Sequence, residues 1–416
     1  MICVKKKLFR REKYLSRIRG FYHTTDLIKV ITGVRRCGKS SLMHTIAEEL
    51  IESGVRNDHI FYYNLDKYGY KNIKSEEALE KLLFSNSNIE GTKYVFIDEI
   101  QNVKNFELVI NALREEDEYS IFITGSNSYL LSGELVTKLT GRYIEFELFT
   151  LSFDEYIEMK SFYNISIDER LEVELDKYIL EGGFPKTLDF ETISDKRTYV
   201  ESVIEEIFEK DIKRRVQIKN KSVFAKVMRY IINNFGNKTS ISNIISELEK
   251  DGINIKRETV NRYINILLDA KILYKCERFD LKSKRSLCGK EKYYLADLSF
   301  YFINNVDNRI NYGPVLENIV YIYAKSYNYK IAIGIIGKFE CDFILRGNDM
   351  SYSYVQVTMT IMDSIDTENR EYHPYEMIRD NFPKYLLTRN DLIQKRNGVI
   401  HANIPQFIVE KRKFDL

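Results

Sequence analysis

The eight residues GVRRCGKS, from Gly33 to Ser40, constrain the fold of this chain more than any other stretch of its sequence. They fit the pattern G-x-x-x-x-G-K-[ST], in which glycines let backbone amides curl around phosphate oxygens at the start of a helix. Lys39 would pair with the terminal phosphates of a nucleotide, and Ser40 would be a ligand of Mg²⁺. The candidate nucleotide-binding residues are Gly33, Val34, Arg35, Arg36, Cys37, Gly38, Lys39, Ser40 and Ser41.

Short apolar runs alternate with helical stretches between about residues 27 and 150. The strand candidates are LIKVITG, HIFYYNL, KYVFIDE, SIFITGS and YIEFELF. Apolar strands that alternate with helices predict a parallel sheet covered on both faces. The first run leads directly into the phosphate loop, so the loop belongs to this sheet.

Two acidic residues follow the third run. Four apolar or aromatic residues, Tyr94 to Ile97, lead directly into Asp98 and Glu99. We expect Asp98 to hold the Mg²⁺ through water, and Glu99 to orient and deprotonate the attacking water. The alternative is a pair of surface acids that end a strand, but this does not account for their occurrence together with the loop.

The acid pair favours one class of reaction. A kinase passes the phosphoryl group to another molecule and must exclude water, whereas an adjacent carboxylate base favours hydrolysis. The sequence also lacks the Asn-Lys-x-Asp motif with which GTPases read guanine, so ATP is the expected nucleotide. The sequence therefore predicts an ATPase.

Two further candidates lie near the ends of predicted strands. The run SIFITGSNS ends in a polar turn, where Ser126, or Asn127 as second choice, would sense the terminal phosphate; such a turn also simply ends a strand. Arg142 stands just before the last strand of this sheet and would stabilise transition-state charge, in its own site or in a neighbour's. The alternative is a surface arginine that pairs with Glu134 or Glu145.

The rest of the chain has a different pattern. It turns helical from Ser152 to about Asn220, with a break at the sequence GGFP. From Ser222 to about Cys276 we expect a helix, a short helix, a turn, a helix and a strand, with the apolar spacing of a helix-turn-helix. The remainder mixes strands and helices.

Several stretches together resemble the AAA-type P-loop ATPases of bacteria and archaea that end in a nuclease-like domain of unknown function. They include IKVITGVRRCGKSSLM, YVFIDEIQ, FITGSNSYLLSGELVTKLTGRYIEFELFTLSFDEY, YILEGGFPKTL, KYYLADLSFYFI and GPVLENIVYIYA. The resemblance covers most of the chain and implies an α/β multidomain protein. Its parts would be an ATPase domain over residues 1–150, a helical lid over 151–220, a winged helix-turn-helix over 221–290 and a restriction-endonuclease-like α/β domain over 291–416.

The resemblance also assigns a role to the GGFP sequence. In related signalling ATPases a Gly-x-Pro element of the lid region touches the nucleotide, and Gly183, Phe184 and Pro185 match it here. Pro185 is therefore a further candidate nucleotide-binding residue. The alternative is an ordinary turn between helices.

Basic residues gather around the helix-turn-helix. Lys256, Arg257, Asn261 and Arg262 lie near the start of its second helix, the end that enters a groove in DNA-binding versions. The following segment KCERFDLKSKRSLCGKEK has seven Lys or Arg against three acids, although the whole chain has 63 against 61. Such a local excess would contact the phosphates of duplex DNA. Alternatively the charge lies on the solvated face of a module that packs against its neighbours.

The last domain raises the question of nucleic-acid cleavage. Nucleases of the restriction-endonuclease type bind Mg²⁺ with acids and need a lysine two residues after an acid or glutamine on a strand. Glu317, Asp342 and Gln356 match the first positions, Glu340 adds an acid, and Thr358 occupies the place of the lysine. Because threonine supplies no positive charge, we expect a structural or partner-binding domain rather than a nuclease.

The cysteines and the apolar runs bear on the cellular compartment. The five cysteines are scattered without metal spacing, and the basic start leads into no apolar run of signal-peptide or membrane-spanning length. We therefore expect reduced thiols in a cytoplasmic protein. The leading interpretation is an ATP- and Mg²⁺-dependent switch with duplex DNA as its candidate partner, and a homo-oligomer would place Arg142 in a neighbour's site. The alternatives are a DNA- or partner-binding regulator with nucleotide as a structural ligand, and a Mg²⁺-dependent nuclease.

Overall fold

The computed structural model describes residues 7–85, 89–125, 139, 141–213, 218, 220–305 and 309–414. The chain divides into two compact units, Met1–Phe149 and Thr150–Leu416, which we call unit 1 and unit 2. Among the described residues, none of the helices combines the length and the apolar character needed to cross a bilayer.

Unit 1 contains a five-stranded sheet in the order β2-β3-β4-β1-β5, and all its pairs are parallel. Each strand forms at one of the predicted apolar runs, and β4 begins one residue before its run, so the predicted parallel sheet is confirmed. Strand β4 lies between the loop strand β1 and the acid strand β3, and the carboxyl ends of all three meet at one edge. The strands are β1 (Ile28–Thr32), β2 (Ile60–Asn64), β3 (Lys93–Asp98), β4 (Tyr119–Thr124) and β5 (Tyr143–Glu147).

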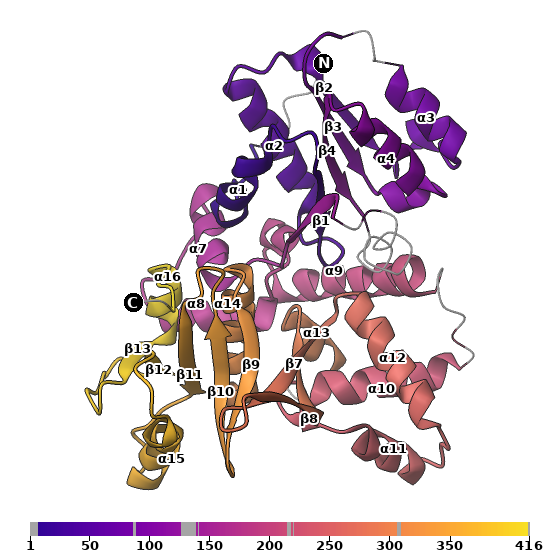
Figure 1. Ribbon diagram of the computed structural model, residues 1–416. Coiled ribbons are helices and arrows are strands. Elements are labelled where there is room, and N and C mark those ends of the chain that lie inside the picture. The colour runs from indigo at the N-terminus through magenta and orange to yellow at the C-terminus, as the bar shows by residue number, and fades with distance from the viewer. Residues whose placement is uncertain are drawn as a thin grey trace. The chain divides into compact units, whose positions relative to one another are not determined.

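Helices cover both faces of this sheet (Figure 1). On one face Val95, Ile97 and Ile121 form an apolar core with residues of α3 and α4. The alternate strand residues Phe96 and Phe122 are also fully buried and point to the opposite face, where α2 lies. The helical segments are α1 (Glu12–Ile18), η1 (Arg19–Phe21), α2 (Lys39–Glu52), η2 (Asn57–His59), η3 (Tyr68–Tyr70), α3 (Glu76–Phe84), η4 (Ile100–Asn102) and α4 (Phe106–Glu115).

The first half of unit 2 is mostly helical, as the sequence predicts. Helices form in the segments SFDEYIEM and ERLEVELDKYILEGG and in the described part of KRTYVESVIEEIFEKDIKRR, and two more form at the predicted helix-turn-helix. The segments are α7 (Phe153–Phe162), α8 (Leu171–Glu181), η5 (Pro185–Asp189), α9 (Ile193–Glu206), the π-helical turn η6 (Ile207–Ile212), α10 (Lys221–Asn233), α11 (Ile241–Lys250) and α12 (Arg257–Asp269).

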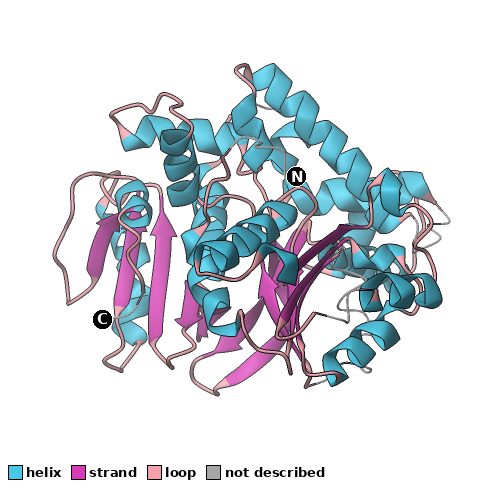
Figure 2. Cartoon of the chain, turned by 90° about the horizontal axis from the view of Figure 1, so that it is seen from above, coloured by secondary structure: helices cyan, strands magenta, loops and turns pink. Residues whose placement is uncertain are grey.

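The second half of unit 2 is organised around a mixed eight-stranded sheet in the order β13-β12-β11-β10-β9-β7-β8-β6. Figure 2 shows the strands near the C-terminus side by side with helices against them. The sheet strands are β6 (Lys238–Thr239), β7 (Leu273–Asp280), β8 (Arg285–Leu295), β9 (Lys330–Ile336), β10 (Phe339–Arg346), β11 (Tyr352–Thr358), β12 (Lys384–Thr388) and β13 (Ile400–Asn403). The remaining helices are α13 (Ser299–Asn304), α14 (Tyr312–Ser326), α15 (Ile365–Met377) and α16 (Ile404–Val409).

The hairpin of β7 and β8 belongs to the same sheet as the later strands. Strand β7 pairs in parallel with β9, where Phe279 lies opposite Gly334. Strand β8 runs through residue 290, the position at which the sequence analysis places the boundary between the third and fourth domains. The strand that follows α12 therefore leads directly into the sheet of the terminal region.

Candidate functional site

The phosphate loop between β1 and α2 depends on two glycines. Gly33 has φ 138° and Gly38 has φ 108°, values in a region that L side chains rarely adopt. A Cβ atom on Gly33 would lie 2.1 Å from the carbonyl oxygen of Leu148, so the backbone there has no room for a side chain. Gly38 is the N-cap of α2, which begins at Lys39. The loop therefore ends at a helix N-terminus, as the sequence predicts.

Lys39 is buried beneath the loop and is held by neutral groups. Its Nζ donates to the carbonyl oxygens of Gly33 at 3.0 Å and Val34 at 3.2 Å. Its residue is 7% exposed, and within the described residues no carboxylate forms an ion pair with it. Because a buried ammonium without a counter-charge is costly, the arrangement favours the arrival of an anion.

A second buried cation, Arg11, supports the outside of the loop. Its Nη1 donates to the carbonyl oxygens of Cys37 at 3.1 Å and Phe149 at 2.8 Å. Cys37 itself is fully buried, and burial raises the pKa of its thiol. Sequence reasoning did not identify Arg11, because it lies outside the motif and reaches the loop only through the packing of the N-terminal segment.

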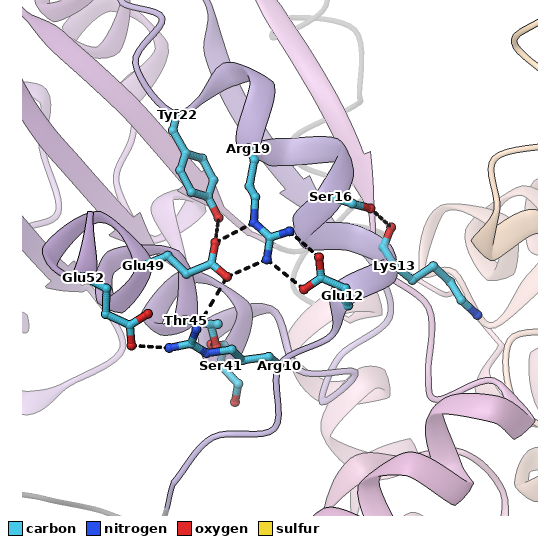
Figure 3. A network of polar contacts seen from close by, with 10 residues as sticks. All are labelled: Arg10, Glu12, Lys13, Ser16, Arg19, Tyr22, Ser41, Thr45, Glu49 and Glu52. Atoms are coloured by element: carbon cyan, nitrogen blue, oxygen red, sulfur yellow. Dashed lines mark hydrogen bonds and ion pairs between the residues drawn. The ribbon is translucent and has the colours of Figure 1, made fainter. Parts of the chain in front are cut away.

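The N-terminal segment also braces α2, the helix that begins at the loop (Figure 3). Arg19 forms ion pairs with Glu12 of its own segment and with Glu49 of α2, where Nη2 lies 2.8 Å from Oε1. The hydroxyl of Tyr22 donates to Glu49 at 2.8 Å. The hydrogen bond from Arg19 holds the pKa of Glu49 below its ordinary value. These contacts fix the distal part of α2 and so steady the loop at its other end.

Asp98 lies at the carboxyl end of β3 and is fully buried. The amide of Asn64, at the end of β2, donates to its Oδ2 at 2.9 Å. The hydroxyl of Thr124, at the end of β4, donates to its Oδ1. Both partners are neutral, and the described residues provide no cation within ion-pair distance of this carboxylate. Asp98 is therefore held in a fixed orientation with its negative charge uncompensated.

Glu99 follows in a left-handed conformation, with φ 60° and ψ 46°. For a non-glycine residue this conformation costs about 1–3 kcal/mol and persists where the surroundings impose it. Its backbone N–H donates to the Thr124 hydroxyl oxygen at 3.2 Å, and the amide of Gln101 donates to its Oε2. Thr124 thus links the two acids, since it accepts from Glu99 and donates to Asp98.

Sequence reasoning missed Asn64, Thr124 and Gln101 as residues that position the acids. A signal for two of them exists, since Asn64 and Thr124 are polar residues at the carboxyl ends of the runs that form β2 and β4. In a parallel sheet those ends share one edge with Asp98. Ser126 and Asn127, the candidates that the sequence favours at this turn, lie outside the described residues.

Arg142 is not brought to the loop of its own unit. It immediately precedes β5, and its carbonyl oxygen accepts a hydrogen bond from the N–H of Ile28 at the beginning of β1. The loop leaves β1 at the other end, after Thr32, which at strand spacing is roughly 13 Å away. The Arg142 side chain is on the surface, where Nη1 donates to Asn111 at 2.9 Å.

The GGFP turn is anchored within unit 2 by Asp297. The N–H of Gly183 donates to its Oδ2 at 2.8 Å, and a Cβ on Gly182 would lie 2.1 Å from its Oδ1. Burial raises the pKa of Asp297. Pro185 begins η5 directly after this turn. The turn therefore has a structural role inside its own unit, and Asp297, in the sequence YYLADLS, is the partner that sequence reasoning did not find.

The nuclease-like candidates in unit 2 surround a lysine from another strand. Nζ of Lys292, on β8, lies 2.9 Å from Oε2 of Glu317, 3.2 Å from Oε1 of Glu340 and 4.0 Å from Oδ1 of Asp342. Burial opposes the charge of Lys292, yet Glu317, Asp342 and Glu340 hold its pKa above the ordinary value. Thr358 does stand at the end of β11, but the cluster has a cation of its own.

The other polar groups of this cluster also find hydrogen-bond partners within the protein. Asp342 accepts from the N–H of Val357 at 2.8 Å, and its own N–H donates to Gln356 at 3.2 Å. The Gln356 amide donates in turn to Glu371 at 2.9 Å. Burial, and then the charge of Glu317, raise the pKa of Asp342 well above its ordinary value. Within the part of the chain that the structure describes, no group of three or more His, Cys, Asp or Glu residues is arranged to hold a metal ion.

The candidate DNA contacts are on the surface of unit 2. Lys256 is the N-cap of α12, and Arg257, Asn261 and Arg262 follow on its first turns, all exposed. The turn between β7 and β8 carries further exposed basic residues, namely Lys282, Lys284 and Arg285.

Comparison with known proteins agrees with this arrangement. Residues 25–157 match a family model described as an AAA domain, and residues 172–305 match one described as a domain of unknown function. The chain is 32% identical over 388 residues to an uncharacterized protein of Haemophilus influenzae, which covers 92% of this chain and 94% of the relative. It is 29% identical over 409 residues to an uncharacterized protein of Methanocaldococcus jannaschii, covering 92% and 87%.

A solved structure shares the fold. It is a Walker-type ATPase of Pyrococcus abyssi, whose match has a TM-score of 0.50 and a sequence identity of 16%. The match covers 72% of this chain and 98% of the chain of that ATPase. At this level of identity the similarity concerns the fold alone.

Proposed function

The chain belongs to a family of AAA-domain proteins that includes the Haemophilus influenzae relative, and from this premise we propose that unit 1 binds ATP with Mg²⁺ and hydrolyses it. One observation carries the proposal. Lys39 and Asp98 are both buried at the carboxyl edge of the sheet, and each is held by neutral partners with its charge uncompensated. An anion and a cation are needed there together, and a Mg²⁺–nucleotide complex supplies both.

The residues fit this ligand in detail. The backbone amides from Gly33 to Ser41 would cradle the phosphates, because Gly33 and Gly38 allow the required curl and α2 presents its N-terminus. Lys39 would exchange its two carbonyl partners for phosphate oxygens. Ser40 and Asp98 would hold the Mg²⁺, which when bound polarises the terminal phosphate.

Glu99 would accept the proton of the attacking water. Its backbone is fixed by Thr124 and its carboxylate by Gln101, so the base is oriented before the water arrives. Transfer to water, rather than to a second substrate, follows from a carboxylate base next to the Mg²⁺ ligand.

Arg142 would contact the terminal phosphate in a neighbouring subunit, not in its own. It lies at the amino edge of the sheet, whereas the loop lies at the carboxyl edge, and an arginine side chain does not bridge that length of strand. This role requires a homo-oligomer, in which the exposed Arg142 of one subunit meets the loop of the next.

A second candidate function is nucleotide-dependent binding of duplex DNA through α12, read as the recognition helix of a winged helix. The exposed positions of Lys256, Arg257, Asn261 and Arg262 at the start of α12 favour it. Salt-dependent binding of a duplex oligonucleotide, weakened by Arg257→Gln and Arg262→Gln, would support this function. Absence of duplex binding at low salt would remove it.

The proposed ATPase is tested with the purified full chain. With ATP and Mg²⁺ we expect phosphate release that stops when EDTA removes the metal. Lys39→Ala should lose at least about 30-fold in ATP affinity, since it removes a desolvated charge partner. Lys71→Ala, at an exposed lysine of the same unit, serves as the matched control. A wild-type protein that neither binds nor hydrolyses ATP would sink the proposal.

A further inference from the structure

A groove of about 1160 Å³ opens at one end of the large sheet of unit 2. It is lined by the end of β7 and the turn after it, the β9–β10 turn, β11, and the end of α15 with the segment after it. The groove contains neither the carboxylates around Lys292 nor any residue of α12. It is therefore distinct from the acid cluster and from α12, and of the basic residues in the segment that the sequence suggests for duplex DNA it shares only Lys282 and Lys284.

Aromatic side chains form its wall. The ring centroids of Tyr352 and Phe382 lie 5.0 Å apart, and the ring of Phe339 also lines the groove. Phe382 is 48% exposed, a large fraction for a phenylalanine, and Phe339 and Tyr352 are partly exposed. Exposed rings of this kind bind flat, unpaired bases, because every base has a stacking face.

Positive charge surrounds the rings. Lys282, Lys284, Lys338 and Arg379 line the groove and are exposed, and within the described residues none of the four pairs with a carboxylate. The groove has one acid, Asp380, which accepts the hydroxyl of Tyr354 at 2.6 Å. Four unpaired cations against one engaged acid form a strongly basic patch on a chain whose net charge is +2.

We propose that this groove binds single-stranded nucleic acid, with bases stacked on the Phe339, Tyr352 and Phe382 rings and phosphates paired with the four cations. Interleaved rings and cations match the alternation of base and phosphate along a strand. An acidic peptide would use the cations but would offer no flat base to the exposed rings. A duplex keeps its bases stacked inside the helix, so the rings favour a single strand over a double one.

This inference goes beyond the proposed ATPase and does not depend on it. Binding is measured without nucleotide, using the full chain and a fluorescent oligothymidylate of about 12 nucleotides, within the usual site size. We expect saturable binding that weakens as salt rises, because phosphate contacts release counterions. A duplex of the same length and a poly-glutamate peptide serve as competitors.

Two groove variants test the two parts of the interaction. Phe382→Ala removes an exposed ring and should weaken binding about 5- to 150-fold, the range for one stacked base. Lys338→Gln should weaken binding and reduce the slope of log affinity against log salt by about 0.7. Leu392→Ala and Lys395→Gln, exposed residues of unit 2 outside the groove, are the matched controls and should bind like wild type.

The outcomes separate clearly. Loss in both groove variants, with intact controls and with an ATP turnover equal to that of wild type, supports the proposal. It is overturned if the oligonucleotide does not bind at low salt, or if duplex or poly-glutamate competes as well as the single strand. It is also overturned if Phe382→Ala binds like wild type. A failure of ATP turnover in wild type leaves these results unchanged.

Discussion

Two buried lysines in this chain sit in opposite electrostatic surroundings. Lys39 of unit 1 donates to two backbone carbonyls and faces no carboxylate within ion-pair distance among the described residues. Lys292 of unit 2 lies within 4.0 Å of Glu317, Glu340 and Asp342. Both are largely buried, at 7% and 5% exposed. The two sites thus differ in charge compensation rather than in residue type.

This difference separates a site that needs a ligand from one that is satisfied. At the loop, Lys39 and Asp98 keep uncompensated charges of opposite sign, and the proposed Mg²⁺–nucleotide complex would compensate both. Around Lys292 the carboxylates are compensated by Lys292 itself and by Lys238, which pairs with Glu340, and the raised pKa of Asp342 reduces the demand for a cation further. The nuclease pattern lacks a lysine at Thr358. Lys292 of β8 lies close to the same acids, but it neutralises the carboxylates that a metal would use.

The largest effect is expected when the compensated cation is removed. Within the described residues, Lys292→Met would leave Glu317 without a cation and Glu340 with Lys238 alone, and should destabilise unit 2 by about 3–5 kcal/mol. Hydrogen exchange of the β8 and β10 amides measures this locally. Lys292→Met combined with Glu317→Gln should recover part of the loss.

The matched change at the loop should behave differently. Lys39→Met removes a charge that has no counter-charge, so unit 1 should keep its stability while ATP binding is lost. If Lys39→Met destabilised unit 1 as strongly as Lys292→Met destabilises unit 2, the contrast between the two lysines would be wrong.

The hydroxyl of Thr124 is the next test, since it links Asp98 to the backbone of Glu99. Thr124→Val has the same shape without the hydroxyl, and should cost unit 1 about 1–3 kcal/mol because two buried polar groups lose a partner. ATP turnover should also fall in Thr124→Val, whereas Thr124→Ser should keep both the stability of unit 1 and the turnover. Urea unfolding and phosphate release measure the two effects. Equal turnover in the valine and serine variants would remove Thr124 from the positioning role.

A third buried lysine, Lys29 on β1, extends the comparison, because its effect on the free energy of unfolding should depend on pH. It is held by the carbonyls of Thr24 and Leu27 and the hydroxyl of Ser120, and burial lowers its pKa to about 7. Between pH 7 and the ordinary lysine pKa the unfolded state binds the extra proton, so the free energy of unfolding rises with pH. The slope is at most about 1.4 kcal/mol per pH unit.

Lys29→Met should abolish this contribution. The difference in the free energy of unfolding between wild type and variant should therefore change by about 1 kcal/mol per pH unit between pH 7 and 9, in favour of wild type at the higher pH. Urea unfolding of both proteins at pH 7, 8 and 9 measures this change. Groups that titrate equally in wild type and variant cancel when the two free energies are subtracted. A difference that is constant with pH would show that Lys29 stays charged.

The smallest effect on stability is expected at Arg142. Its surface contact with Asn111 is worth less than about 1 kcal/mol, so Arg142→Ala should unfold like wild type. If a neighbouring subunit supplies this arginine, turnover should fall in the variant, and mass measurements should show an oligomer with ATP. Asn111→Ala is the control for the local contact. Full turnover in Arg142→Ala would exclude a catalytic role.

The parts of the site that the sequence predicts are those encoded locally. The loop from Gly33 to Ser40 and the acids Asp98 and Glu99 each lie next to the strand that places them, and the alternation of apolar runs is enough to predict the parallel sheet. Asn64 and Thr124 reach Asp98 because of the strand order, which brings together residues that are 34 and 26 positions away from it.

Two further features depend on contacts that are not local. The sequence has Thr358 two residues after Gln356, where the nuclease pattern has a lysine, and the structure brings Lys292 of β8 to the acids from 25 residues before Glu317. Arg142, a candidate for its own site or for a neighbour's, precedes the parallel strand β5 and so lies at the edge of the sheet opposite to the loop. Non-local pairing and strand direction decide both cases, and neither is visible in a short motif.

The most direct test of the account is Glu99→Gln, measured for ATP binding and for turnover in the same preparation. The glutamine keeps the size and the hydrogen-bonding capacity of the side chain but cannot accept the proton of water at neutral pH. We expect ATP affinity close to that of wild type and a loss of turnover of at least about 100-fold. Turnover equal to that of wild type would contradict the assignment of Glu99 as the base and, with it, the hydrolytic site proposed at this edge of the sheet.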